Sequence, residues 1–344
     1  MTKTVYDYRI LKWTSKNKMS DSNPKRASED EIPILDAQSI VSNDDISLLA
    51  KSVREACQNM GFFYVKNHGI SQIIIDDAFE ASKRFFSEPI EKKMLVSKDK
   101  FHRGYLPIGT TRYPGKAADL KDSFDVGIEL PLSHPDVVAG LPLHGPNQWP
   151  NINGFREAAE LYFASVKQFG FGLLRVFAKS LELEESFFIN YYQNPTVLMR
   201  LLHYPPQEQA QEPGSFGAYP HTDYGVITVL AQDPSGGLEL QKTDGSWIAA
   251  PYVPGTFVIN IGDLMARWTN GLYQSNKHQV VNRTGKERFS IPFFSTRSIV
   301  LSSNAYPIAI NLITCMFIRL LWQVNTLPTK LEPTRALRIK YTNN

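Results

Sequence analysis

The stretch His221-Thr-Asp-Tyr-Gly-Val-Ile-Thr-Val-Leu230 decides the fold of this chain. Its apolar part begins at Val226 and continues to Ala231; this segment is rich in β-branched residues and has the composition of a buried strand. In an extended segment, side chains two residues apart point the same way, so His221 and Asp223 would lie on one side of the chain. The stretch therefore predicts a β-rich fold with a polar pair beside a buried strand.

This polar pair has the chemistry of a metal site. An imidazole nitrogen of His221 and a carboxylate oxygen of Asp223 could bind one ion, and a second histidine would complete the set. His278 is the expected partner because it lies in another strand-like segment, residues 275–281. Two histidines and one carboxylate leave coordination positions open, which suits an Fe(II) site that activates oxygen. We expect His68, His102, His134 and His144 to have ordinary surface or core roles.

A second polar pair follows ten residues after His278. Arg288 and Ser290 lead into the expected strand 291–294, and a period of two again places them on one face. A guanidinium offers two parallel N–H donors that match the two oxygens of a carboxylate. The pair could therefore anchor an acid in a β pocket, although Arg288 taken alone could equally form a surface salt bridge.

Around these motifs, the chain changes from helical to strand patterns. Glycine, proline and few periodic runs predict loops and short strands in residues 95–150. Apolar spacing of three or four predicts helices at about 43–61, 72–86 and 155–183. We expect strands at 32–35, 62–65, 197–203, 226–231, 238–241 and 256–261. Helices first and strands later indicate the α+β class, with a β sandwich or barrel covered on one side by helices.

Composition excludes several classes of protein. Of the 344 residues, 42% are hydrophobic and 21% are charged, which is the balance of a globular protein with a sizeable core. Lys plus Arg is 37 against 34 for Asp plus Glu, so nothing indicates a nucleic-acid partner. Cys57 and Cys315 are far apart, which excludes a disulfide scaffold and fits the cytoplasm. Residues 1–30 are polar and aperiodic, and we expect a disordered arm there.

The apolar run from Ala305 to Trp322 approaches the length of a membrane span. It contains Pro307 and Arg319, which are unfavourable in a lipid-facing helix, so we expect no membrane partner. We expect residues 299–323 either to pack against the body or to be poorly ordered. Two explanations for the unusual composition of residues 298–344 stay open: a divergent C-terminal segment, or a coding sequence that reads through an intron.

Taken in order, the motifs resemble the iron- and 2-oxoglutarate-dependent dioxygenases of the isopenicillin N synthase-like superfamily. The resemblance covers about residues 31–297 and rests on motifs in both halves of the chain. These are the stretch 221–230, Gly237-Leu-Glu-Leu-Gln241, Asn260-Ile-Gly-Asp263, Asn276 to Arg283, Ile32-Pro-Ile-Leu-Asp36 and Gly61 to Gly69.

The resemblance implies a double-stranded β-helix, or jelly roll, with helices packed on it. It implies an N-terminal non-heme dioxygenase region at 31–150, a long helix and connector at 151–195, and the jelly-roll domain at 196–297. It also implies that Fe(II) is held by three ligands: His221, Asp223 and His278.

The resemblance further implies a 2-oxoglutarate site. The distal carboxylate of this co-substrate would meet Arg288 and Ser290, and its keto-acid end would chelate the iron. Tyr204 matches a tyrosine that assists the co-substrate in plant relatives. Where those relatives have asparagine two residues earlier, this chain has Leu202.

The activity implied is hydroxylation or desaturation of a small organic molecule, with O2 consumed, succinate and CO2 released, and ascorbate as an activator. Relatives act in secondary metabolism on flavonoids, gibberellins and alkaloids, and also on peptides and small acids. Substrate contacts are expected from two segments, 103–106 and 123–126, and in particular from Arg103, Tyr105 and Phe124.

Two alternatives stay open. In an oxidase like isopenicillin N synthase, the same arginine would hold the substrate's own carboxylate, and no 2-oxoglutarate would be used. A metal-free binding module is the other alternative, but it would not need to keep His221, Asp223 and His278 together.

Overall fold

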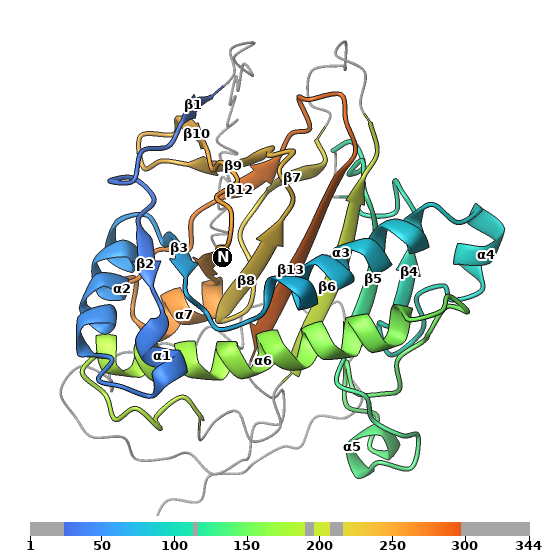
Figure 1. Ribbon diagram of the computed structural model, residues 1–344, viewed down its shortest axis with the longest axis horizontal. Coiled ribbons are helices and arrows are strands. Elements are labelled where there is room, and N and C mark those ends of the chain that lie inside the picture. The colour runs from blue at the N-terminus through green and yellow to red at the C-terminus, as the bar shows by residue number, and fades with distance from the viewer. Residues whose placement is uncertain (1–23, 113–115, 190–195, 207–215, 297–344) are drawn as a thin grey trace, which may run out of the picture.

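The computed structural model describes residues 24–112, 116–189, 196–206 and 216–296, which form two β-sheets and a layer of helices (Figure 1). The larger sheet has eight strands, in the order β2 (Ile34–Asp36), β3 (Phe62–Lys66), β11 (Phe257–Ile261), β8 (Ile227–Gln232), β13 (Arg288–Thr296), β6 (Thr196–Tyr204), β5 (Asp122–Gly127) and β4 (Gly104–Leu106). The smaller has five, in the order β1 (Lys25–Arg26), β10 (Trp247–Ala249), β9 (Leu238–Gln241), β12 (His278–Val280) and β7 (Ala218–His221).

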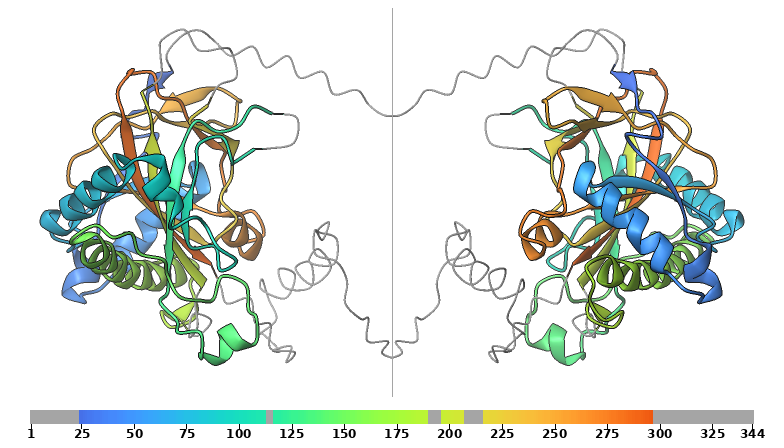
Figure 2. Two further views of the ribbon diagram at one scale, coloured as in Figure 1. Left: turned by 90° about the vertical axis from the view of Figure 1, so that its right-hand side faces the viewer. Right: turned by 90° about the vertical axis from the view of Figure 1, so that its left-hand side faces the viewer.

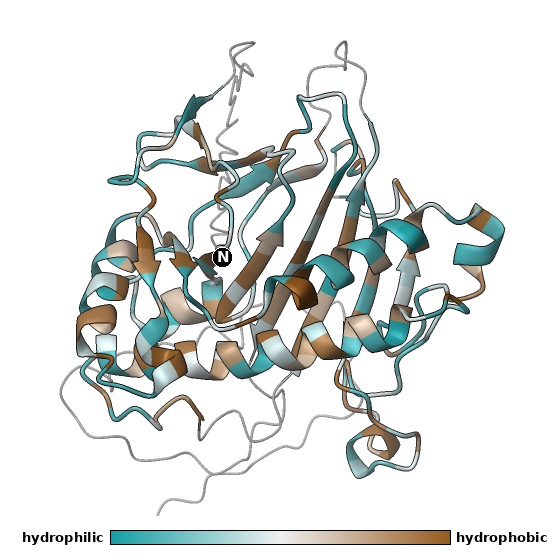
Figure 3. Cartoon of the chain, viewed as in Figure 1, coloured by the Kyte–Doolittle hydropathy of each residue, from teal (hydrophilic) through white to brown (hydrophobic). Residues whose placement is uncertain are grey.

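Helices cover one face of the eight-stranded sheet (Figures 1 and 2). The described helices are α1 (Gln38–Ser42), α2 (Ser47–Asn59), α3 (Gln72–Phe86), α4 (Ile90–Met94), α5 (Pro135–Val138), α6 (Phe155–Ser180) and α7 (Asp263–Trp268). The stripe predicted for α6 is confirmed, since its side chains at three- and four-residue spacing are buried from Phe155 to Phe177. Figure 3, coloured by residue hydropathy, shows hydrophobic and hydrophilic residues alternating along α3 and α6.

The alternation of side chains in the large sheet separates the core from the site. Odd-numbered residues of the central strands, such as Met199, Val229 and Phe293, belong to the main hydrophobic core with the helices. Even-numbered residues face the smaller sheet, where Leu202 and Tyr204 pack against Ala218 and Val280. The space between the two sheets therefore receives the polar side chains of the even positions.

Most of the predicted long elements are present with small shifts at their ends. Helix α2 begins at Ser47, not near residue 43, because the Asp45 carboxylate accepts hydrogen bonds from the backbone and hydroxyl of Ser47. The prediction of disorder up to residue 30 is wrong for β1, which pairs with β10. Glu31 holds this segment further through an ion pair with Lys242 at 3.0 Å.

The other predictions for the two chain ends concern residues that the structure does not describe. Residues 1–23 and the whole segment 298–344 lie outside the described residues, as does the apolar run at 305–322. Within the described ranges, no helix has the length and apolar character needed to cross a membrane.

Candidate active site

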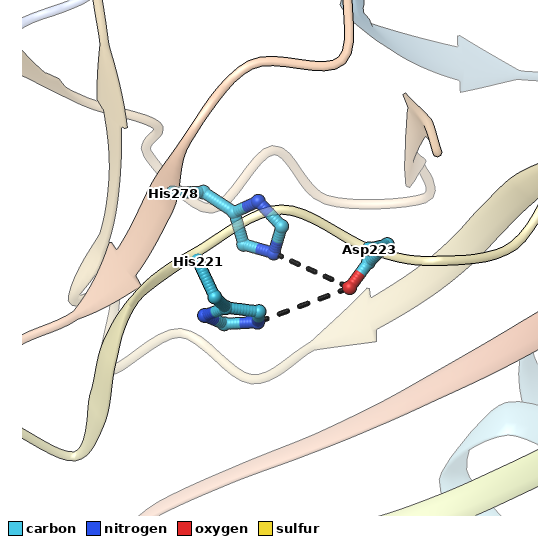
Figure 4. Close-up of side chains that lie close together, drawn as sticks. All are labelled: His221, Asp223 and His278. Carbon is cyan, nitrogen blue, oxygen red and sulfur yellow. Dashed lines mark ion pairs between the residues drawn. The ribbon is translucent and has the colours of Figure 1, made fainter. Parts of the chain in front are cut away.

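Three of the predicted site residues meet between the two sheets. The Nε2 atoms of His221 and His278 lie 3.8 and 3.7 Å from Oδ1 of Asp223 (Figure 4). The donor atoms of this triad all lie within 4.8 Å of one another. Ligands that bond one ion at about 2.1 Å can be at most about 4.2 Å apart, so each carboxylate–imidazole separation fits a shared ion.

Strand pairing brings the two histidines together. His278 of β12 lies opposite His221 of β7 in an antiparallel register, and their ring centroids are 4.3 Å apart. The Nδ1 atom of His221 lies 2.6 Å from the carbonyl oxygen of Tyr219. Because that oxygen can only accept, Nδ1 donates and Nε2 keeps its lone pair toward Asp223. Burial, assisted by the neighbouring His278, lowers the pKa of His221 to about 4, so the ring is neutral at pH 7.

Asp223 reaches the histidines from a loop, which corrects the predicted geometry. Strand β7 ends at His221, so strand alternation does not align the pair. Two hydrogen bonds hold the carboxylate instead, from the Thr228 hydroxyl at 2.6 Å and the Asn260 amide at 2.8 Å, both to Oδ2. Burial acts to raise the pKa of Asp223, but the two imidazoles and these donors lower it below its usual value. The carboxylate is therefore ionised, with Oδ1 aimed at the histidines.

Thr228 and Asn260 were missed as site residues by sequence reasoning. The sequence held a signal for each of them. Asn260 belongs to the quoted motif 260–263, and Thr228 carries the only hydroxyl in the otherwise apolar segment from Val226 to Ala231. Their even numbers place them on the inner face, where β8 and β11 pair Thr228 with Asn260. Pairing of these strands therefore creates the cradle for Asp223.

The second predicted cluster forms at the start of β13. Arg288 is 1% exposed, and its Nη1 donates to the Ser290 hydroxyl at 3.0 Å while Nε donates to the Gly236 carbonyl at 2.5 Å. Gly237, at φ +91°, keeps this turn close because an added Cβ would lie 2.8 Å from the Val281 carbonyl oxygen. Among the described residues, Nη2 of Arg288 has no acceptor. The N–H groups on this edge of the guanidinium are therefore left to donate to an anion.

Tyr204 links this cluster to the triad. Its ring lies 4.6 Å from the Arg288 guanidinium carbon, in cation–π contact. The same ring packs against Ala218 and Val280, in the strands that carry His221 and His278. The Arg288 cluster and the triad therefore face a common space between the sheets.

The predicted substrate contacts are not borne out by the structure. Phe124 and Tyr105 point to the helix side, where both pack against Phe85 at 4.8 and 5.7 Å between ring centroids. Arg103 is buried and donates to the backbone carbonyls of Phe101 and Leu143. In β5, the residues on either side of Phe124 lie on the opposite face of the sheet: Ser123 pairs with Leu202, and Asp125 pairs with Arg200.

Comparison with known proteins identifies the class that this fold and site define. Residues 32–152 match the family described as non-haem dioxygenase in morphine synthesis N-terminal, and residues 184–297 match the 2OG-Fe(II) oxygenase superfamily. The chain is 38% identical over 273 residues to the 2-oxoglutarate-Fe(II) type oxidoreductase hxnY of Emericella nidulans, covering 76% of this chain and 78% of that protein.

Two further relatives have the same architecture or sequence pattern. The chain is 34% identical over 306 residues to a 1-aminocyclopropane-1-carboxylate oxidase of Dictyostelium discoideum, covering 78% of this chain and 83% of the relative. A full-length Neurospora crassa protein, crystallised in complex with alpha-KG and thymine, superposes with a TM-score of 0.70 and 28% identity, covering 86% of this chain and 99% of that one.

The chain therefore belongs to the 2OG-Fe(II) oxygenase superfamily. It is a 2-oxoglutarate- and Fe(II)-dependent oxygenase with the α+β jelly-roll architecture that the sequence predicted, and Fe(II), 2-oxoglutarate and O2 are the cofactor and co-substrates of its family.

Proposed function

We propose that this oxygenase hydroxylates or desaturates a small organic molecule, with Fe(II) held by His221, Asp223 and His278. The observation that carries the proposal is the convergence of three donor atoms, from one carboxylate and two imidazoles, between the sheets. These three residues would hold the ion and leave coordination positions for the co-substrate and oxygen. With 2-oxoglutarate and O2 bound, the ion would supply the oxidising chemistry for a C–H bond of the substrate.

The residues around the ion have defined tasks in this proposal. The Tyr219 carbonyl orients His221 through Nδ1, and Thr228 and Asn260 hold Asp223 in its loop. Such outer contacts keep ligand atoms in place and raise the affinity for the ion. The chain would therefore bind iron with a site that is largely formed before the ion arrives.

Arg288, Ser290 and Tyr204 would hold 2-oxoglutarate. The open Nη2 of Arg288 and the Ser290 hydroxyl can donate to its distal carboxylate, and the buried setting strengthens this contact. The Tyr204 ring lies against the guanidinium and toward the strands of the triad, so it would guide the chain of the co-substrate toward the iron. Leu202, beside Ser290 in the register, offers only an apolar contact.

The setting of the reaction is also proposed. The family description that mentions morphine synthesis supports a role in secondary metabolism, and the thymine bound to the Neurospora crassa relative is an example of a small-molecule ligand in a similar fold. The buried free thiol of Cys57 supports a reducing compartment, and we propose the cytoplasm.

Titration of 2-oxoglutarate into the anaerobic Fe(II) protein tests the proposed function. We expect a visible charge-transfer band from chelation by the keto acid, and succinate release when oxygen, ascorbate and a substrate panel are added. Absence of the band, with iron confirmed in the sample, would instead favour an oxidase that uses no 2-oxoglutarate.

A conservative change in the cradle tests how the triad is held. Thr228→Val keeps the shape of the side chain but removes the hydroxyl that donates to Asp223 at 2.6 Å. We expect iron affinity to fall about 10- to 100-fold, as is typical for outer contacts of a metal site. The matched control is Thr269→Val, because this buried hydroxyl donates to the Met265 carbonyl in α7. Equal iron affinities in the two variants would contradict the proposal that the Thr228 hydroxyl holds Asp223 in place for the iron.

A further inference from the structure

A charged cluster on the inner face of the large sheet is not used by the iron or the co-substrate. Asp125 of β5 is fully buried and accepts hydrogen bonds from Arg200 of β6, at 2.6 Å from Nε and 2.9 Å from Nη2. The same carboxylate accepts from Nζ of Lys98 at 2.7 Å. We call Lys98, Asp125 and Arg200 the Arg200 cluster.

The Arg200 cluster has unused donors. A guanidinium carries five N–H groups, and two of those on Arg200 bind Asp125. Within the described ranges of the chain, the other three have no protein acceptor. The Arg200 side chain is 27% exposed although it lies in a central strand, so part of its surface faces open space between the sheets. Its free edge is available to a ligand.

The cluster also carries excess charge. Two cations surround one carboxylate, and burial of uncompensated charge is costly. At the proposed iron site the charges are already matched, because Asp223 and the two carboxylates of 2-oxoglutarate balance the ion and Arg288. Neither the ion nor the co-substrate therefore needs the extra positive charge of the Arg200 cluster.

The position of Arg200 connects the cluster to the reaction. Strand pairing places Arg200 on the same face as Leu202 and Tyr204, directly beside the strand of Ser290. Burial acts to lower the pKa of Arg200, but Asp125, together with Tyr204 and Asp223, raises it. Arg200 also lies 5.8 Å from the ring centroid of Phe294, a half-buried side chain on this face.

We infer that the substrate is a small carboxylic acid whose carboxylate binds Arg200 and whose apolar body packs against Phe294. This inference rests on the proposed function, since it assigns the third ligand of the same site. Leu198 and Leu230 are half-buried on the same face and extend the apolar surface around Phe294. The free N–H groups of Arg200 would bind the carboxylate of the substrate. The apolar contacts around Phe294 would hold a C–H bond of the substrate toward the triad.

Paired ligands test the inference without turnover. Anaerobic protein loaded with Fe(II) and 2-oxoglutarate is titrated with small aromatic and aliphatic carboxylic acids, each beside its primary amide, and binding is measured as a change in the charge-transfer band. We expect acids to bind, and each amide to bind about tenfold more weakly or worse, because a charged partner is lost. If no acid binds, or if amides bind equally well, the inference is wrong.

Substitutions of Arg200 test whether this residue causes the preference for acids over amides. Arg200→Gln should reduce acid binding to the level of the amide while the affinity for 2-oxoglutarate changes by less than about twofold. Arg200→Lys keeps the charge and should keep part of the preference, which covers the case of a poorly folded glutamine variant. Retained acid preference in Arg200→Gln would overturn the assignment, whereas loss of the 2-oxoglutarate band in the wild type would count against the proposed function instead.

A matched arginine controls for general effects. Arg175 on α6 is 30% exposed and binds Glu185 through Nε and Nη2, much as Arg200 binds Asp125, but it lies outside the space between the sheets. Arg175→Gln should leave the preference for acids unchanged. An equal loss of preference in both variants would show that the effect is not local to Arg200.

Discussion

Asp223→Asn is expected to abolish iron binding at micromolar iron and, with it, succinate release. The change keeps the shape of the side chain but removes the one negative charge among the three donors. Outer contacts alone change metal affinity 10- to 100-fold, so loss of this ligand should cost at least about 100-fold. Iron content after gel filtration and calorimetric titration of Fe(II) under anaerobic conditions measure the effect.

A second buried aspartate provides the control for this experiment. Asp122 is 1% exposed and accepts from His203 Nδ1 at 2.7 Å and from the Tyr105 hydroxyl at 2.9 Å. This carboxylate–imidazole pair lies on the helix side of the sheet, away from the triad. Asp122→Asn should bind iron normally and lose about 1–3 kcal/mol of unfolding free energy. Full iron binding by Asp223→Asn would remove Asp223 from the site.

Arg288→Leu is expected to weaken 2-oxoglutarate binding by about 2–5 kcal/mol, because it removes one partner of a buried charge pair. In affinity this is a loss of about 30- to 4,000-fold. Iron binding should persist, since Arg288 contacts Ser290 and Gly236 and none of the three iron ligands. The charge-transfer band, titrated with 2-oxoglutarate in wild type and variant, measures the shift directly.

The neighbouring arginine serves for comparison. Arg283 is 32% exposed and binds Glu239 at 3.0 Å, so Arg283→Leu removes an arginine ion pair without opening the proposed pocket. We expect its 2-oxoglutarate affinity to stay close to that of the wild type. If Arg288→Leu and wild type bind 2-oxoglutarate equally, Arg288 does not hold the co-substrate, and the arrangement of an oxidase, with this arginine on the substrate, becomes the better description.

The local pattern of the sequence was sufficient for most of the long elements and for the choice of the candidate iron ligands and the Arg288–Ser290 pair. The period of two correctly placed Arg288 and Ser290 on one face of β13, and helical spacing correctly located α3 and α6. These features depend on neighbours a few residues apart, so composition and spacing describe them well. Spacing alone offered His278 only as the expected third metal ligand beside His221 and Asp223. The resemblance, which rests on motifs in a fixed order, gave a second reason to choose it.

The sequence by itself therefore determined which residues are the candidates for the chemistry: His221, Asp223, His278 and the Arg288–Ser290 pair. Only the tertiary structure decided how they are held. Asp223 lies in a loop supported by Thr228 and Asn260, and Arg200 meets Asp125 across two strands. The same pairing turned Phe124 toward the helices, against expectation. The physical reason is that periodicity defines two faces of a strand, whereas long-range pairing decides which face becomes the core and which lines the site.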